Sequence, residues 1–324
     1  MATPHSKIPA PSEFAAAANL AAVGDSSLVL SLSPVVLPAP WRGEDLKLRV
    51  SAPVSGSRLP IIVFAHGFGS SMDAYAPLVD FWAAHGFVVI QPTFLDSRRL
   101  GLREDDPRKP LVWRMRVQDV KLILDRLNFI EDSVPTLKGR LDRSRIAAVG
   151  HSFGAQTTGL LLGARTIDAD GSLGEDMSDS RIKVGVLLSA GGRGGEALSP
   201  FAMEHFPYLN QSYASLTTPT LVVAGDKDYS PLTVLGPEWF TDAYTLSPGA
   251  NRLVTLFGGE HMLGGISGYL VTETTDENPE RVAAVQLLTW AYLRNMLYPG
   301  DPSWSIACRK FSESPNPLGR IDAK

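Results

Sequence analysis

Residues 145–155 read RIAAVGHSFGA, and this stretch decides how the chain is interpreted. A short apolar run typical of a buried strand meets Gly150-His151-Ser152-Phe153-Gly154, and a segment compatible with a helix follows. The pattern G-x-S-x-G in this context places a serine on a sharp turn, with its hydroxyl exposed above a sheet. Side chains at Gly150 and Gly154 would collide across that turn. The pattern alone leaves open an ordinary serine on a strand-to-helix turn, and the rest of the chain decides between the two.

The segments around this turn alternate between strand-like and helix-like patterns. Strands are predicted at residues 28–32, 46–51, 59–65, 87–91, 145–149, 182–188, 220–224 and 252–257. Helices are predicted at 72–84, 111–129, 153–164 and 280–296. The first two strands are expected to be antiparallel at one edge, and the others to be mostly parallel. The predicted fold class is therefore α/β, with a mostly parallel central sheet of about eight strands and helices on both faces.

The length of 324 residues would fit one large domain or two small ones. Because no repeat and no linker separates two cores, we predict a single α/β domain at residues 27–297. An N-terminal arm at 1–26 would precede it, with a short helix at 12–23. A C-terminal tail at 298–324 shows little periodicity. Segment 189–218 is long enough for a loop and one short helix near 201–206, but not for a large cap domain.

Composition excludes several classes of function. The net charge of −4 argues against a nucleic-acid-binding protein, which usually carries a basic patch. The single cysteine, Cys308, allows no disulfide within the chain. No run approaches the roughly 20 apolar residues of a membrane span, and the N-terminus lacks an export signal. We therefore expect a cytoplasmic protein, whose oligomeric state the sequence does not indicate.

An acid and a histidine follow the serine in the order that a Ser-Asp/Glu-His triad on such a sheet requires. Two aspartates, Asp226 and Asp228, come after the strand at 220–224, and His261 follows the strand at 252–257 in a glycine-rich loop. Both aspartates are candidates, and we expect Asp228 to be the acid because the loop must carry it clear of the sheet. Ser152, Asp228 and His261 are the predicted catalytic residues.

An acyl-transfer intermediate also needs two N–H donors for its oxyanion. The backbone N–H of Phe153 follows the serine, and Phe68 lies in the His66-Gly67-Phe68-Gly69 loop after an early strand. These two amides are the predicted oxyanion hole, with His66 and His151 as supports. The polar segment 94–110 is expected on the surface at the border of the site. Arg116 and Asp119, one helical turn apart, are expected to form a helix-surface or helix-to-sheet ion pair.

With these motifs the chain resembles an α/β-hydrolase over residues 28–296. The His66-Gly67-Phe68-Gly69 loop, the Arg116-x-x-Asp119 helix and Gly150-His151-Ser152-Phe153-Gly154 are similar to those of chlorophyllases, bacterial platelet-activating-factor acetylhydrolase-like enzymes, predicted dienelactone hydrolases and polyester-degrading cutinases. Two features depart from that group. Chlorophyllases usually carry another residue after the serine and a glycine where Ala155 stands, and dienelactone hydrolases proper use a cysteine nucleophile.

The resemblance implies a serine carboxylic-ester hydrolase that uses no metal and no organic cofactor. We expect a small-molecule substrate, an acyl or aryl ester of small to medium size, in an open or half-covered cleft. Phe201, Phe206, Trp239 and Met262 are candidates to line it, although each could equally belong to the core. The same triad could instead serve an amidase, an acyltransferase or a perhydrolase. A non-catalytic receptor or scaffold with this fold is a further alternative, which the intact Ser, Asp, His and glycine set disfavours. A metal enzyme is a third, which no closely spaced His/Cys/Asp cluster in the sequence supports.

Overall fold

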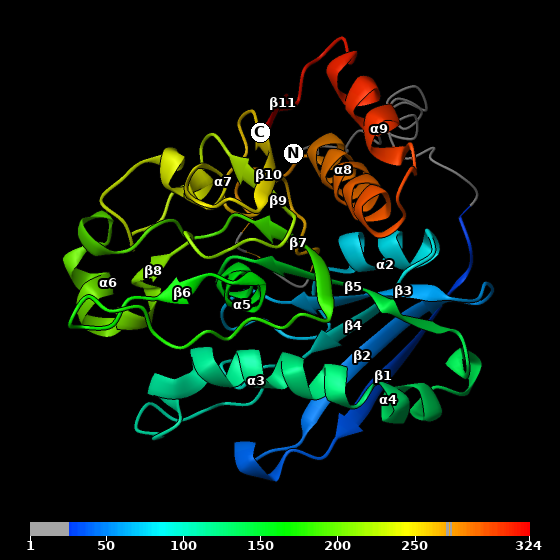
Figure 1. Cartoon of the computed structure of the whole chain (residues 1–324), viewed down its shortest axis with the longest axis horizontal. Helices are drawn as coiled ribbons and strands as arrows, with labels where there is room; N and C mark the ends of the chain where they lie inside the picture. Colours follow the sequence, from blue (N-terminus) through cyan, green and yellow to red (C-terminus); the bar gives the residue numbers. More distant parts are fainter. Residues whose placement is uncertain (1–25, 270–271, 273) are drawn as a thin grey trace, which may run out of the picture.

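The computed structural model describes residues 26–324 except 270, 271 and 273. A sheet lies between two sets of helices (Figure 1). The strands are β1 (Val29–Leu37), β2 (Leu46–Pro53), β3 (Leu59–Ala65), β4 (Val88–Pro92), β5 (Leu141–His151), β6 (Arg165–Thr166), β7 (Ile182–Leu188), β8 (Gln211–Ser212), β9 (Thr220–Gly225), β10 (Ala250–Leu256) and β11 (Gly319–Ala323). The α-helices are α2 (Ala76–Ala84), α3 (Val112–Asp125), α4 (Leu127–Ser133), α5 (Phe153–Leu162), α6 (Pro200–His205), α7 (Asp242–Leu246), α8 (Pro279–Leu297) and α9 (Ser303–Ser312). The helix predicted at 12–23 lies outside the described residues.

The main sheet has nine strands in the order β1-β2-β4-β3-β5-β7-β9-β10-β11. From β4 to β10 neighbouring strands pair in parallel, whereas β1 and β2 pair antiparallel at one edge as predicted. The parallel strands are buried on both faces, which explains their continuous apolar sequences. The sequence predicts eight of the nine strands, and the predicted fold class, α/β with a mostly parallel sheet, is confirmed.

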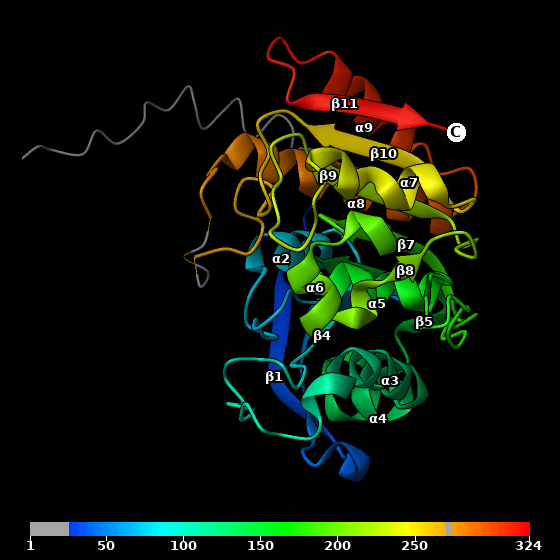
Figure 2. The ribbon, with the colours of Figure 1, turned by 90° about the vertical axis from the view of Figure 1, so that its left-hand side faces the viewer.

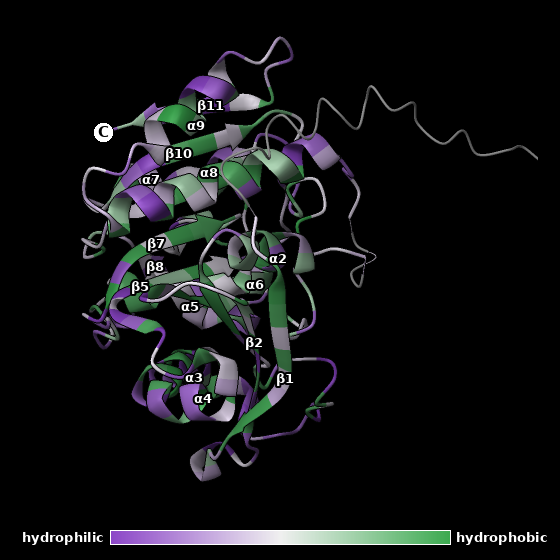
Figure 3. Ribbon diagram, turned by 90° about the vertical axis from the view of Figure 1, so that its right-hand side faces the viewer, coloured by the Kyte–Doolittle hydropathy of each residue, from purple (hydrophilic) through white to green (hydrophobic). Residues whose placement is uncertain are grey.

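Two hydrophobic clusters hold helices to the two faces of the sheet. Apolar side chains of α3, α4 and α5 pack on one face, and those of α2, α8 and α9 on the other. Figure 3 shows the strands mostly in the apolar colour and the exposed sides of the helices in the polar colour. The helix predicted at 111–129 is two helices, because α3 ends at Asp125 and α4 begins at Leu127.

The C-terminal tail, predicted to lack periodicity, contributes a helix and the ninth strand. Helix α9 buries Trp304, Ala307 and Phe311, which recur at i, i+3 and i+7. Strand β11 pairs antiparallel with β10 and covers that edge of the sheet (Figure 2). Its sequence, GRIDA, is short and has two charged residues among five, as is common in edge strands, and this is why its pattern is not recognisable.

The segment between β7 and β9 is small, as predicted. It holds helix α6, short 3-10 turns and strand β8, which pairs with β6 in a separate two-stranded sheet. Among the described residues, no helix is both long and apolar enough to cross a membrane.

Candidate functional site

Ser152 stands at the junction of β5 and α5, in a backbone conformation that side chains rarely adopt. Its φ is 56° and its ψ is −121°, and helix α5 begins at the next residue. A Cβ atom on Gly154 would overlap the Ala65 carbonyl and lie 2.7 Å from the His66 oxygen, and one on Gly150 would overlap the Gly154 carbonyl. The two glycines thus let β3, β5 and α5 approach closely enough to hold the strained turn.

Alanine substitution of two glycines in α5 should have opposite effects. Gly154→Ala is expected to lower the free energy of unfolding by about 3 kcal/mol, because the backbone of β3 would have to move. Gly159→Ala is the matched control, since its Cβ would meet only Ala164 and Tyr213 at an ordinary 3.7 Å. That variant should gain about 0.5–1 kcal/mol from its helical position. Urea denaturation of both measures the difference, and equal stabilities would contradict this account of the turn.

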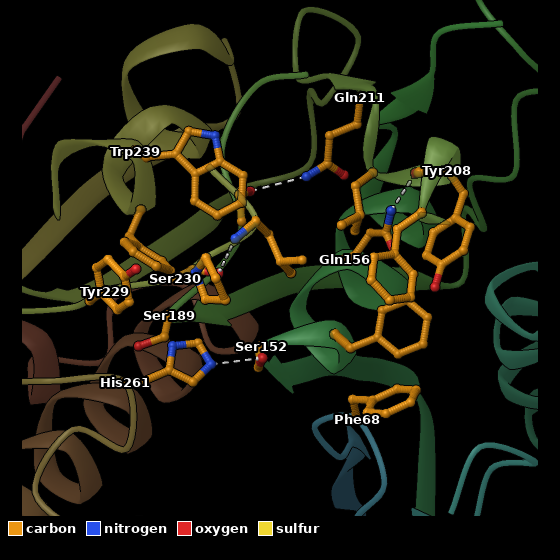
Figure 4. Close-up of a pocket in the computed structure, with 17 residues that line it drawn as sticks. Phe68, Ser152, Gln156, Ser189, Tyr208, Gln211, Tyr229, Ser230, Trp239 and His261 are labelled. Carbon is orange, nitrogen blue, oxygen red and sulfur yellow. Dashed lines mark hydrogen bonds between the residues drawn. The ribbon is translucent and has the colours of Figure 1, made fainter. Parts of the chain in front are cut away.

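In the structure, the three predicted catalytic side chains form a hydrogen-bonded triad. His261 Nε2 lies 2.8 Å from Ser152 Oγ (Figure 4), and His261 Nδ1 lies 2.9 Å from Asp228 Oδ1. Because the carboxylate can only accept, Nδ1 carries the proton, and Nε2 accepts from the serine hydroxyl. Asp228 is 1% exposed, whereas Asp226 binds the Gly258 N–H with its Oδ1. The structure thus places Asp228, and not Asp226, against His261.

The two predicted oxyanion donors lie on either side of Ser152. Phe153 is the first residue of α5, and Phe68 lies in the loop after β3. Their rings are 6.1 Å apart. Within the described part of the chain, neither backbone N–H has a hydrogen-bond acceptor. Both amides are therefore available to a ligand oxygen.

The two supporting histidines are buried and uncharged. Burial and the neighbouring Arg116 lower the pKa of His66 to about 4, and burial and His261 lower that of His151 to about 3. His151 Nε2 lies 2.8 Å from the His261 carbonyl and donates to it, so its Nδ1 accepts from the Tyr75 hydroxyl at 2.9 Å. Tyr75 in turn accepts the Gly67 N–H at 3.1 Å. This chain of bonds connects the Gly67 loop, the serine turn and the His261 loop.

The sequence did not identify three residues that hold the Gly67 loop, namely Tyr75, Arg116 and Asp96. Tyr75 falls in a predicted helix, but it precedes α2 with a φ of 65°. Arg116 and Asp119 do not bond to each other, because Arg116 pairs with Asp96 and Asp119 pairs with Arg42. The side chains of both pairs are at most 4% exposed, so neither pair lies on the helix surface. The polar segment 94–110, expected to border the site, supplies Asp96, and the only signal in the sequence is its density of charge.

Two cavities meet at Ser152, and they divide the predicted substrate-lining residues. One, of about 370 Å³, is mostly apolar, and its walls include the aromatic side chains of Phe68, Phe153, Phe206, Tyr208, Tyr229, Trp239 and Phe240. The other, of about 380 Å³, is more polar and contains Ser70, Arg98, Arg99 and Met262. Phe206 and Trp239 thus line the apolar cavity and Met262 the polar one. Phe201 lines neither but packs edge-on against Phe206. Tyr208 and Tyr229 (Figure 4) were not among the candidates, and neither was Phe240, because loop aromatics have no pattern that separates pocket from core.

Comparison with known proteins identifies the family of the chain. Platelet-activating factor acetylhydrolase of Cavia porcellus is 29% identical over 168 residues, which cover 40% of this chain and 36% of that protein. The protein of the same name from Bos taurus is 27% identical over 165 residues, covering 40% of this chain and 35% of its own. The match thus spans only about a third of each relative. The pattern of the alpha/beta hydrolase family matches residues 62–304, about three quarters of the sequence, and includes Ser152, Asp228 and His261. The chain therefore belongs to the alpha/beta hydrolase family.

Proposed function

We propose that this chain is a serine carboxylic-ester hydrolase that acts on small to medium acyl or aryl esters. The observation that carries the proposal is the row Ser152–His261–Asp228, with distances of 2.8 and 2.9 Å, beside two unoccupied backbone N–H donors. A serine hydroxyl becomes a useful nucleophile when an oriented base takes its proton. The aromatic cavity beside Ser152 suits an acyl or aryl group. The relatives' names, acetylhydrolase, support a short acyl group.

The proposed reaction has two halves. In the first, His261 Nε2 takes the Ser152 proton while Oγ bonds to the ester carbonyl carbon, and the Phe68 and Phe153 N–H groups bind the oxyanion. The intermediate then breaks its bond to the alcohol oxygen, which leaves with the proton from His261. In the second half, His261 takes a proton from water while the hydroxyl attacks the acyl carbon, and the bond from that carbon to Oγ then breaks. Oγ takes the proton back from His261, which restores the serine hydroxyl and frees the carboxylic acid. Throughout, Asp228 holds the imidazole in the tautomer that these steps need.

Hydrolysis of p-nitrophenyl esters from acetate to decanoate tests this function. We expect turnover, with kcat/KM highest among the short and medium chains, because the apolar cavity measures about 370 Å³. A maximum at decanoate would contradict the proposed size of substrate. The absence of turnover on every ester, with a Ser152 that still reacts with an active-site probe, would move the assignment to amide hydrolysis or acyl transfer.

A further inference from the structure

A buried ion pair lies directly beneath the loop that carries Phe68. Arg116, on α3, binds Asp96 through two parallel hydrogen bonds, Nε to Oδ1 at 2.8 Å and Nη2 to Oδ2 at 2.7 Å. Their side chains are 0% and 4% exposed. The guanidinium has five N–H donors in a fixed plane, so donors remain after the carboxylate is bound.

The remaining donors and the carboxylate bind the backbone on both sides of Phe68. Arg116 Nη1 donates to the His66 carbonyl at 2.8 Å, and Nη2 approaches the Gly67 carbonyl at 3.4 Å. Asp96 Oδ2 accepts the Gly69 N–H at 3.0 Å and so holds the peptide that follows Phe68. The ion pair thus holds peptide groups before and after Phe68, the residue proposed as an oxyanion donor.

His66 adds a bond to the same peptide. Its Nε2 accepts the Phe94 N–H at 3.1 Å, so in the neutral ring Nδ1 carries the proton and donates to the Gly67 carbonyl at 2.7 Å. The approach of Arg116 Nη2 to Nδ1, at 3.4 Å, therefore joins two donors and is not a hydrogen bond. The Gly67 carbonyl also accepts the Ser70 N–H at 3.2 Å.

These contacts determine the direction of the Phe68 amide. In a planar trans peptide the N–H points opposite to the C=O, so a Gly67 carbonyl held beneath the loop directs the Phe68 N–H away from Arg116 and into the site. The neighbouring Gly67 and Gly69 N–H groups bind Tyr75 and Asp96. Arg116 also touches the other proposed donor residue, because its guanidinium lies 4.3 Å from the centroid of the Phe153 ring.

We propose that Arg116, held by Asp96, is a positioning residue that pre-organises the oxyanion hole. It holds the Gly67–Phe68 peptide in the orientation that aims the Phe68 N–H at the developing oxyanion, and it packs against Phe153. The inference rests on the proposed ester hydrolysis. It predicts that loss of the pair impairs the stabilisation of charge in the transition state more than the binding of substrate.

A second buried ion pair, which also has one member on α3, provides a matched control. Arg42 binds Asp119 at 3.0 Å and donates to the carbonyls of Glu44, Asp45 and Thr93. The pair is as deeply buried as Arg116–Asp96. Arg42 is therefore also a buried cation that holds backbone carbonyls, but the carbonyls it holds are not those of the oxyanion loop.

The test compares two double variants in which each ion pair is replaced by uncharged residues. We expect R116M/D96N to lower kcat by about 100-fold with little change in KM, as a misplaced catalytic group does. We expect R42M/D119N to lower the melting temperature comparably and to lower kcat far less, because Arg42 reaches the oxyanion loop only through the Thr93–Phe94 peptide that binds His66. The affinity for an alkyl trifluoromethyl ketone, whose adduct with Ser152 carries an oxyanion, should fall with kcat in the first variant alone. Equal losses of kcat in the two variants, or an unchanged inhibitor affinity in R116M/D96N, would overturn the proposal.

The single substitution Arg116→Lys keeps the test decisive if R116M/D96N fails to fold. Lysine keeps the charge but cannot reach Asp96 and both carbonyls at once. We expect an intermediate loss of kcat at unchanged KM, and an unaltered kcat would refute the role. If the native chain hydrolyses no ester, the proposed function fails separately. The positioning role of Arg116 would then be tested by the rate at which a fluorophosphonate labels Ser152, which should be slower in Arg116→Lys.

Discussion

Replacing Ser152 by alanine should abolish ester hydrolysis, with kcat lower by about 10⁶-fold. The loss follows from the removal of the Oγ atom that lies 2.8 Å from His261 Nε2, because this atom is the proposed nucleophile. The fold should survive, because alanine keeps the Cβ atom and adds no strain to the turn at φ 56°. Initial rates on p-nitrophenyl butyrate and a thermal unfolding curve measure both expectations.

Ser230→Ala is the matched control for that variant. Ser230 lines the same aromatic cavity, but its hydroxyl accepts a hydrogen bond from the Leu232 N–H and does not contact His261. We expect it to keep most of the activity. A Ser152→Ala protein that is folded and still hydrolyses the ester would exclude Ser152 as the nucleophile.

Replacing Asp228 by asparagine should lower kcat by about 10⁴-fold and leave the fold intact. An amide is nearly the shape of a carboxylate, but it lacks the charge that stabilises a protonated imidazole. It also no longer favours the tautomer with the proton on Nδ1, which frees Nε2 to accept the serine proton. The steady-state kcat of the purified variant, measured beside the native chain, gives the size of the effect.

Asp226→Asn tests the choice between the two aspartates. Asp226 is two residues away on the same loop, and it accepts the Gly258 N–H at 2.7 Å instead of facing His261. An amide oxygen can accept that bond equally well, so the activity should change little. A larger loss in Asp226→Asn than in Asp228→Asn would reverse the assignment of the acid.

Much of the fold could be predicted because its strands are buried on both faces. Nearly continuous apolar runs form β3, β7 and β9. Such runs can be recognised from the local sequence alone, without knowledge of which strands pair. β11 differs, because an edge strand has one neighbour and tolerates charged residues such as Arg320 and Asp322. Its place in the sheet depends on pairing with β10, which local pattern does not encode.

For the candidate site, too, the residues that follow a strand could be predicted, and the contacts that depend on tertiary packing could not. Ser152, Asp228 and His261 could be predicted, because each follows a parallel strand and those strand ends meet at one edge of the sheet. The contact of Arg116 with the oxyanion loop could not, since it depends on how α3 packs beneath segment 66–69. Arg42 and Arg116 each bind a buried aspartate and backbone carbonyls, but only Arg116 binds the carbonyls of the oxyanion loop. Their local sequences do not show this difference.

The most direct test of the central claim is to treat the native chain with a fluorophosphonate and to map the modified residue by mass spectrometry. The row of Ser152, His261 and Asp228 predicts one rapid covalent adduct, located on Ser152 and absent from the Ser152→Ala variant. An unmodified Ser152 in a folded chain, or an adduct at another residue, would contradict the assignment of a serine hydrolase.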